Sequence, residues 1–226
     1  MEKLLIRSRR HPSAVLLAVQ LLGVLLYPFV EQSPVSHVVL NIFGLLVLGI
    51  TTNMVRNTPG WTWISVCLAI PIVVMLILQM TDEMPNLLPW SSGLEAIFYF
   101  YAAGSLIAYM MGDYNATIDE LFAAAATFTL IVWGFTHLFV MTQALQPNAF
   151  AEVGSDATPR TWSELNHLSF ALLTGTGMGN VVAVSSHARA LASIEMMAGL
   201  MYLAAVVTRL IGFTTHPADG GQSKNK

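Results

Sequence analysis

Long hydrophobic runs, separated by short polar segments, set the pattern of this chain. A membrane-spanning helix takes about 20 consecutive apolar residues. Strands of an outer-membrane barrel would instead alternate between apolar and polar positions over about ten residues, and the sequence shows no such alternation. The pattern therefore predicts an all-α integral membrane protein with six transmembrane helices, over residues 13–30, 35–55, 61–79, 90–111, 121–144 and 187–212.

The segment between the fifth and sixth runs departs from this pattern. Residues 146–160 are polar and are typical of an external loop. Thr161 and Glu164 then have the spacing of a capping box, which marks the first turn of a helix. The apolar residues that follow end at Leu173, too early to cross a bilayer. We therefore expect a re-entrant helix that enters the membrane and returns, enclosed by protein or by a water-filled cavity.

Three glycines at alternating positions come directly after this short helix. Glycine adopts left-handed backbone angles that other residues resist, and alternating handedness can point successive carbonyl oxygens in one direction. Four such segments around an axis would form stacked rings of oxygens that replace the water shell of a cation. The negative C-terminal end of the short helix would favour a cation at the same place. Glycines also serve as packing contacts between membrane helices, but that alternative leaves the capped short helix unexplained. The predicted ion-binding filter comprises Thr174, Gly175, Thr176, Gly177, Met178, Gly179 and Asn180.

Residues 162–212 resemble the pore helix, filter and inner helix of bacterial potassium channels. The usual pattern of that family is Phe-x-Asp-Ala-x-Tyr-Phe-Ser, then Thr-Thr-Val-Gly-Tyr-Gly-Asp, then an inner helix with a hinge glycine. The resemblance implies a tetrameric cation channel in the bacterial inner membrane, with Gly199 as the hinge. The residues that carry it are Trp162, Glu164, Leu168, Ser169, Phe170, Thr174, Gly177, Gly179, Glu195 and Gly199, with the stretches 190–192, 202–204 and 209–212.

Three positions of the filter differ from the family pattern. Gly175 stands where the family has a threonine whose hydroxyl forms the innermost ion site. Met178 replaces a tyrosine that braces the filter, and Asn180 replaces an acidic residue at the outer mouth. We therefore expect K⁺ and other monovalent cations, Na⁺ included, to pass, with weaker discrimination between the two.

Composition and charge support the membrane location and set the orientation. Hydrophobic residues make up 55% of the 226 residues and charged residues 10%, whereas a soluble domain carries about a quarter charged residues. The basic residues follow the positive-inside pattern, which places both termini of this multi-pass protein in the cytoplasm. The cytoplasmic set is Lys3, Arg7, Arg9, Arg10, Arg56, Arg209, Lys224 and Lys226, and the two basic residues on the other side are Arg160 and Arg189.

The chain divides into a four-span membrane block, residues 1–114, and a pore domain, residues 115–226. The pore domain would comprise an outer helix, the pore helix, the filter, the inner helix and a short cytoplasmic tail. The fourth run contains no lysine or arginine, and its one charged residue is Glu95. A voltage sensor moves several arginines through the membrane field, so the block is not an arginine-type voltage sensor. We expect it to be a scaffold or a receiver of a ligand, lipid or membrane tension.

Four titratable residues of the predicted pore half are candidates for function. Glu195 is an intramembrane carboxylate, which marks a functional site by default. We expect it behind the filter, either protonated or bonded to the pore helix, with structural and ion-pathway roles both open. His137, His167 and His187 are candidate proton sensors because histidine titrates near neutral pH, although a hydrogen-bonded packing role is the commoner use of a lone histidine.

The inner helix offers a candidate gate. Leu203, Val207 and Ile211 are four residues apart and therefore share one face of a helix. They are candidate pore-lining residues that could close the pore by dewetting, with ordinary packing against lipid or another helix as the alternative. Near the same end, Asp119 and Glu120 are expected to approach Arg209.

Other classes of function have less support in the sequence. The sequence has no nucleotide-binding motif and no cluster of metal ligands, so we expect neither an enzyme nor a cofactor beyond permeant K⁺ and Na⁺. The expected partners are further copies of the chain in a homotetramer and membrane lipid, without nucleic acid. Cys67 is expected to be a small buried residue. Two alternatives stay open: a non-conducting subunit that modulates a partner, and a secondary transporter, although transporters usually show two matching discontinuous helices.

Overall fold

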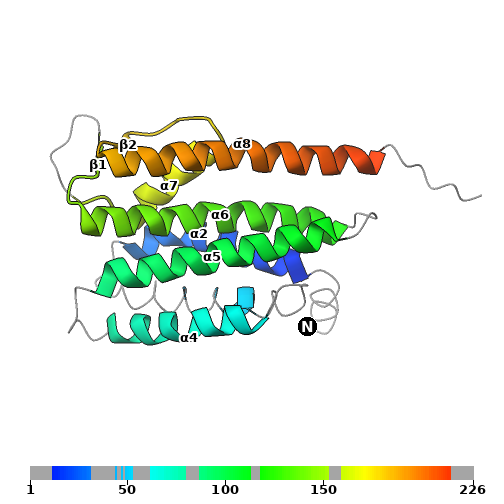
Figure 1. The fold of residues 1–226 in the computed structure, drawn as a ribbon, viewed down its shortest axis with the longest axis horizontal. Coiled ribbons are helices and arrows are strands. Elements are labelled where there is room, and N and C mark those ends of the chain that lie inside the picture. Colours follow the sequence, from blue (N-terminus) through cyan, green and yellow to red (C-terminus); the bar gives the residue numbers. More distant parts are fainter. Residues whose placement is uncertain are drawn as a thin grey trace, which may run out of the picture.

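The computed structural model describes residues 12–31, 44, 47, 49–52, 62–79, 87–112, 118–152 and 159–214. Within its helices it does not describe the side chains of residues 28, 30, 31, 62 and 210–214. The described chain is mostly helical (Figure 1). The helices are α2 (Pro12–Glu31), α4 (Thr62–Gln79), α5 (Leu88–Met111), α6 (Ile118–Leu145), α7 (Trp162–Leu173) and α8 (Ser186–Thr214).

Three described helices are long and apolar enough to cross a membrane, namely Leu88–Met111, Ile118–Leu145 and Ser186–Arg209. The apolar helices Pro12–Tyr27 and Trp63–Gln79 are shorter. Of the second predicted span, residues 44, 47 and 49–52 are helical, and its other residues lie outside the described ones. The described part of the chain is therefore mostly helical, with three candidate membrane spans, which is compatible with an all-α membrane protein.

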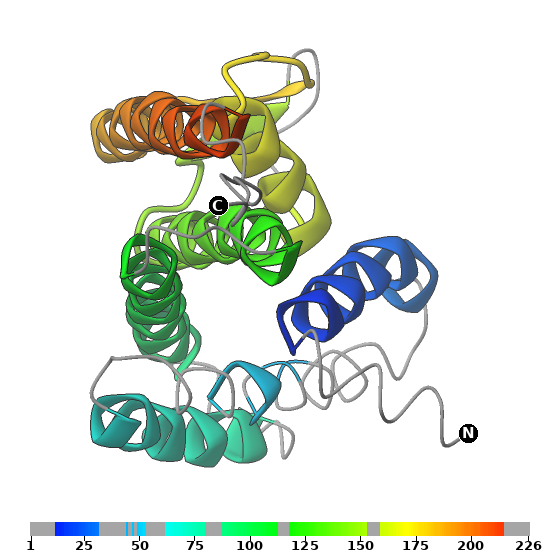
Figure 2. The same ribbon diagram turned by 90° about the vertical axis from the view of Figure 1, so that its right-hand side faces the viewer.

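Helix α6 lies at the centre of the bundle (Figure 2). Helices α2, α4 and α5 lie on one side of it, and α7 and α8 lie on the other. Small residues make the close packing of α5 on α6 possible, because backbones approach where side chains are short. A Cβ added at Gly134 of α6, for example, would lie 2.9 Å from the ring of Phe100 in α5.

Helix α2 packs against α6, and two specific contacts join it to the second half of the chain. Near its start, the Ser13 hydroxyl donates to the Asp119 carboxylate of α6 at 2.8 Å. Near its end, the Tyr27 ring stacks on the Trp162 indole at the start of α7, with ring centroids 4.4 Å apart.

Two short strands modify the predicted all-α fold. Strand β1 (Phe150–Glu152) pairs in antiparallel fashion with β2 (Val181–Ala183), with Ala151 opposite Val182. Three-residue strands are too short to show the alternation that reveals a strand in a sequence, so the polar segment 146–160 gave no sign of β1. The pair joins the chain just after α6 to the chain just before α8.

The expectation that Cys67 is buried is wrong, because its side chain is exposed. Cys67 lies on the outer face of α4, beside the exposed Val66 and Ile70. A membrane helix is apolar on every side, so its sequence does not show which face meets another helix and which meets lipid.

Candidate functional site

The start of α7 is fixed by a capping box, as the sequence predicted. Thr161 Oγ1 accepts a hydrogen bond from the Glu164 backbone N–H at 3.3 Å. In return, Glu164 Oε2 accepts from the Thr161 backbone N–H at 2.7 Å. The two bonds satisfy donors that a helix start leaves without partners. The helix then ends at Leu173, also as predicted.

Residues 174–180, the glycine segment, begin by folding back over the end of α7. The backbone N–H groups of Thr174 and Gly175 donate to the carbonyls of Phe170 and Leu172 at 3.1 and 3.0 Å. The N–H of Gly177 donates to the Ala171 carbonyl at 3.1 Å. These bonds use carbonyls that the last turn of a helix leaves unsatisfied, and they hold the glycine segment against the C-terminal end of α7.

The backbone of the glycine segment alternates in handedness. The φ angles of Gly175, Gly177 and Gly179 are +70°, +62° and +139°, whereas Thr176 and Met178 have ordinary negative values. A Cβ at Gly175 or Gly177 would meet nothing within 4 Å, so glycine is required there by the backbone angle and not by lack of space. All seven residues are exposed in the single chain.

A polar network holds the far end of the glycine segment. Asn180 Nδ2 donates to Glu152 in β1. The other carboxylate oxygen of Glu152 accepts from Arg160 Nη1 at 3.0 Å, and Glu164 lies 3.5 Å from the same nitrogen. Gln143, in the last turn of α6, bonds the backbone N–H and carbonyl of Arg160, each at 2.8 Å. Arg160 is therefore a buried cation that joins the end of α6 and the start of α7 to the glycine segment.

Sequence reasoning missed this network. From the sequence, Arg160 was assigned only a side of the membrane, and no role was assigned to Glu152. The available signal was an arginine directly before a helix cap, within a segment that also contains Glu152 and Asp156.

Behind α7, a carboxyl group of α8 is fully buried. Glu195 accepts a hydrogen bond from the Ser169 hydroxyl of α7, and Ser169 Oγ also lies 2.9 Å from the Val132 carbonyl of α6. The bond between Glu195 and the short helix, one of the two predicted alternatives, is therefore present. One turn later, Gly199 touches the end of α7, where an added Cβ would overlap the Leu173 carbonyl. Gly199 thus has a packing role, and its use as a hinge stays a prediction.

The candidate gate residues are only partly described. Leu203 and Val207 are exposed on α8, with exposed fractions of 38% and 52%. The side chain of Ile211 lies outside the described ones. The structure therefore leaves the Leu203 and Val207 side of α8 open in the single chain.

The predicted contact at the other end of α8 is confirmed for one of the two acids. Arg209 Nη2 donates to Glu120 Oε2 of α6 at 3.0 Å. Asp119 instead accepts from the Ser13 hydroxyl of α2. The two neighbouring acids therefore attach the start of α6 to two different helices.

The three histidines have different surroundings. His137 Nδ1 lies 2.7 Å from Glu95 Oε2, which pairs α6 with α5. His187 Nδ1 lies 2.9 Å from the amide nitrogen of Gln146. His167 is exposed on α7, and a Cβ added at Gly179 would lie 3.5 Å from its ring. A proton-sensing role for any of them stays a prediction.

Among the residues that the structure describes, no group of three or more His, Cys, Asp or Glu side chains could hold a metal ion. The glycine segment itself offers backbone carbonyls, the hydroxyls of Thr174 and Thr176, and the side-chain amide of Asn180. No protein-family model, curated protein or solved structure matches the chain.

Proposed function

We propose that the chain is one subunit of a homotetrameric cation channel of the potassium-channel type, located in the bacterial inner membrane with both termini in the cytoplasm. In this proposal each subunit has six spans, α7 is the re-entrant pore helix, and the glycine segment is the filter through which K⁺ and Na⁺ pass. The observation that carries the proposal is the alternating glycine backbone at the end of a capped short helix.

The course of the chain around α7 supports re-entry. Helix α7 begins beside the last turn of α6, where Gln143 holds Arg160. It ends against Gly199, which is 13 residues into α8. The chain then returns to β2, which pairs with β1 beside the end of α6 (Figure 1). Twelve helical residues extend about 18 Å, and the hydrocarbon core is about 30 Å thick. A helix of this length would enter somewhat more than half of the core, and the return to β2 would bring the chain out on the side from which it came.

Alternating backbone handedness supports cation binding. Residues of opposite handedness along one strand turn successive carbonyl oxygens toward the same side, and rings of such oxygens replace the hydration shell of an ion. The negative end of α7 lies directly before this strand and adds attraction for a cation. One chain supplies one strand, and its exposed side chains leave room for neighbouring copies. Four copies around an axis would complete the rings.

The supports of the glycine segment also fit this use. A filter has to hold its oxygens in place while ions move, and two separate sets of bonds hold this segment. The end of α7 binds Thr174, Gly175 and Gly177, and the Glu152–Arg160 pair binds Asn180.

Substitution of Gly177 tests the proposal. The purified protein in liposomes should carry K⁺ current, and Gly177→Ala should abolish it, because alanine resists a φ of +62°. Gly104→Ala is the matched control, since Gly104 is exposed on α5 and a Cβ there meets nothing within 4 Å. Native mass measurement in nanodiscs should give four chains for all three proteins.

Two results would contradict the proposal. One is a native protein that carries no cation current although it is tetrameric, which would instead favour the non-conducting subunit. The other is a Gly177→Ala current equal to that of Gly104→Ala.

A further inference from the structure

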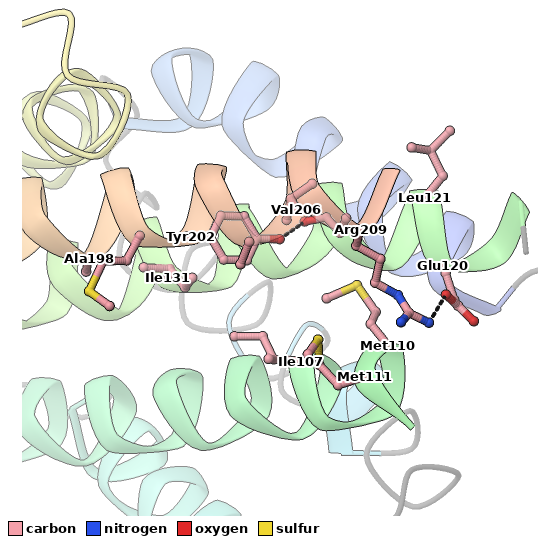
Figure 3. A pocket seen from close by; sticks show the side chains of 13 residues that line it. Ile107, Met110, Met111, Glu120, Leu121, Ile131, Ala198, Tyr202, Val206 and Arg209 are labelled. Carbon is pink, nitrogen blue, oxygen red and sulfur yellow. Dashed lines mark hydrogen bonds and ion pairs between the residues drawn. The ribbon is translucent and has the colours of Figure 1, made fainter. Parts of the chain in front are cut away.

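A cavity of about 330 Å³ lies between the end of α5, the start of α6 and the second half of α8 (Figure 3). Its walls are almost wholly apolar and include Ile107 and Met110 of α5, Ile131 of α6, and Ala198 and Ala205 of α8. Small-molecule sites in proteins occupy about 300–1,000 Å³. The cavity is therefore large enough for a ligand, and no residue of the proposed filter lines it.

The polar groups at the cavity are engaged with each other or with the backbone. Arg209 and Glu120, at one end, form an ion pair at 3.0 Å. The Tyr202 hydroxyl donates to the Ala124 carbonyl at 2.5 Å (Figure 3). A polar ligand would lose its bonds to water in the interior and gain few in return. The chemistry of the walls therefore selects an apolar occupant.

The dimensions of the cavity match one leaflet of a bilayer. Along α8 it extends from Ala198 to Arg209, and eleven residues of helix rise about 16 Å. Half of a hydrocarbon core is about 15 Å. Arg209 lies at the end that the distribution of basic residues places at the cytoplasm, and a long cation near a helix end reaches toward the headgroup level. Its side chain is 22% exposed, compared with 8% for Glu120, so the cation is the more accessible partner.

The cavity is also on the correct side of α8 to meet lipid. Helical residues are spaced by about 100°, at 3.6 residues per turn. Ala198, Ala205 and Arg209 therefore lie nearly opposite Leu203 and Val207. If the Leu203 and Val207 side of α8 lines the pore of the proposed channel, as the sequence predicts, the cavity faces away from the channel axis.

We propose that this cavity binds one acyl chain of a membrane phospholipid, with the phosphate beside Arg209 and the end of the chain beside Ala198 and Ile131. This inference rests on the proposed function for the side of α8 that faces lipid. The bound chain lies between α5 and α8, so it joins the four-span block to the inner helix. Methionine side chains are flexible and adapt to such a chain, and Met110 and Met201 both line the cavity.

A photoreactive phospholipid tests the assignment. The protein is placed in nanodiscs that contain phosphatidylglycerol with a diazirine at the end of one acyl chain, irradiated and mapped by peptide mass spectrometry. We expect adducts at Ile131 and Ala198 in excess of those at Ile97, which is exposed near the middle of α5. Ala205→Phe, which fills the cavity, should lower these adducts about tenfold, a loss equivalent to about 1.4 kcal/mol. Ala204→Phe, on the next residue and outside the cavity, should retain them.

Labelling of the native protein, without any substitution, is enough to overturn the inference. Adducts at Ile97 equal to or greater than those at Ile131 would mean that the chain end stays in bulk lipid. If cavity residues crosslink to a second copy of the chain, the cavity belongs to a subunit interface. If a photoreactive free fatty acid labels the cavity in preference to the phospholipid, the proposed contact between Arg209 and the phosphate is rejected. The labelling does not depend on conduction, so absence of current removes the proposed function without changing this result.

Discussion

At the scale of single residues, the buried carboxyl group of Glu195 depends on one hydroxyl. Glu195 is fully buried and bonds Ser169 of α7, and its second carboxyl oxygen has no partner within the described chain. A buried polar group that loses its bond retains the cost of leaving water. This pair therefore fixes α8 against α7 directly behind the proposed filter.

We predict that Ser169→Ala lowers the free energy of unfolding by about 1–3 kcal/mol, because it removes this bond and leaves the carboxyl group buried. The measurement is denaturant unfolding in mixed micelles. Ser193→Ala is the control, since Ser193 is exposed on α8 and its hydroxyl donates to the Arg189 carbonyl of its own helix. The effect of this control should stay within about 0.5 kcal/mol. Replacing both partners, Ser169→Ala with Glu195→Leu, should recover most of the loss. Equal effects of the two serine substitutions would show that Ser169 does not support Glu195.

At the scale of elements, the fit between α7 and α8 depends on the absence of one side chain. Gly199 brings the backbone of α8 against the last carbonyl of α7. The end of α7 therefore has a fixed position along α8, and the glycine segment starts from that position.

Gly199→Ala and Gly104→Ala should have opposite effects on stability. Alanine in a helix normally gains about 0.5–1 kcal/mol over glycine, and Gly104 has space for it. At Gly199 the new Cβ overlaps the Leu173 carbonyl, so we expect a loss of about 1–3 kcal/mol. The same unfolding measurement compares the two variants. A stabilising effect at both positions would mean that α7 and α8 are not held at this contact.

The elements also show which features can be derived from the sequence. The Thr161–Glu164 capping box and the end of α7 at Leu173 were predicted correctly, because both are set by residues within one or two turns. The approach of Glu120 to Arg209 was predicted from their opposite charges at neighbouring helix ends. The pairing of β1 with β2 was missed, because it joins residues about 30 positions apart and gives no local pattern. The face of α4 that bears Cys67 was assigned wrongly, because lipid and protein neighbours require the same apolar side chains.

At the scale of the whole molecule, α5 takes the place of a voltage-sensing helix in the proposed six-span plan, and charge is sparse in it. Helix α5 contains no lysine or arginine, and its one charged residue, Glu95, lies 2.7 Å from His137 of α6. Moving one charge across the membrane supplies about 2.3 kcal/mol per 100 mV. With its carboxylate held by α6, α5 offers little charge that the field could move.

We therefore predict that current through the channel depends weakly on voltage. Liposome patches should show open probabilities that change little between −100 and +100 mV, an interval over which one transferred charge would contribute about 4.6 kcal/mol. Glu95→Gln should leave this weak dependence unchanged. Steep activation in the native protein would require a sensor outside α5.

The contacts of Ser13 with Asp119 and of Tyr27 with Trp162 join the first half of this chain, residues 1–114, to the second half, residues 115–226. A chain shortened to residues 115–226 would keep α6, α7 and α8 but would expose the Trp162 face that Tyr27 covers and would leave Asp119 without Ser13. The proposed pore half should therefore fold poorly as an independent unit, although it contains every residue of the proposed filter. Conversely, a tilt of α2 would act on the start of α6 and the start of α7 together. A force on α2 thus has a route to the proposed filter that bypasses α5 and the candidate gate.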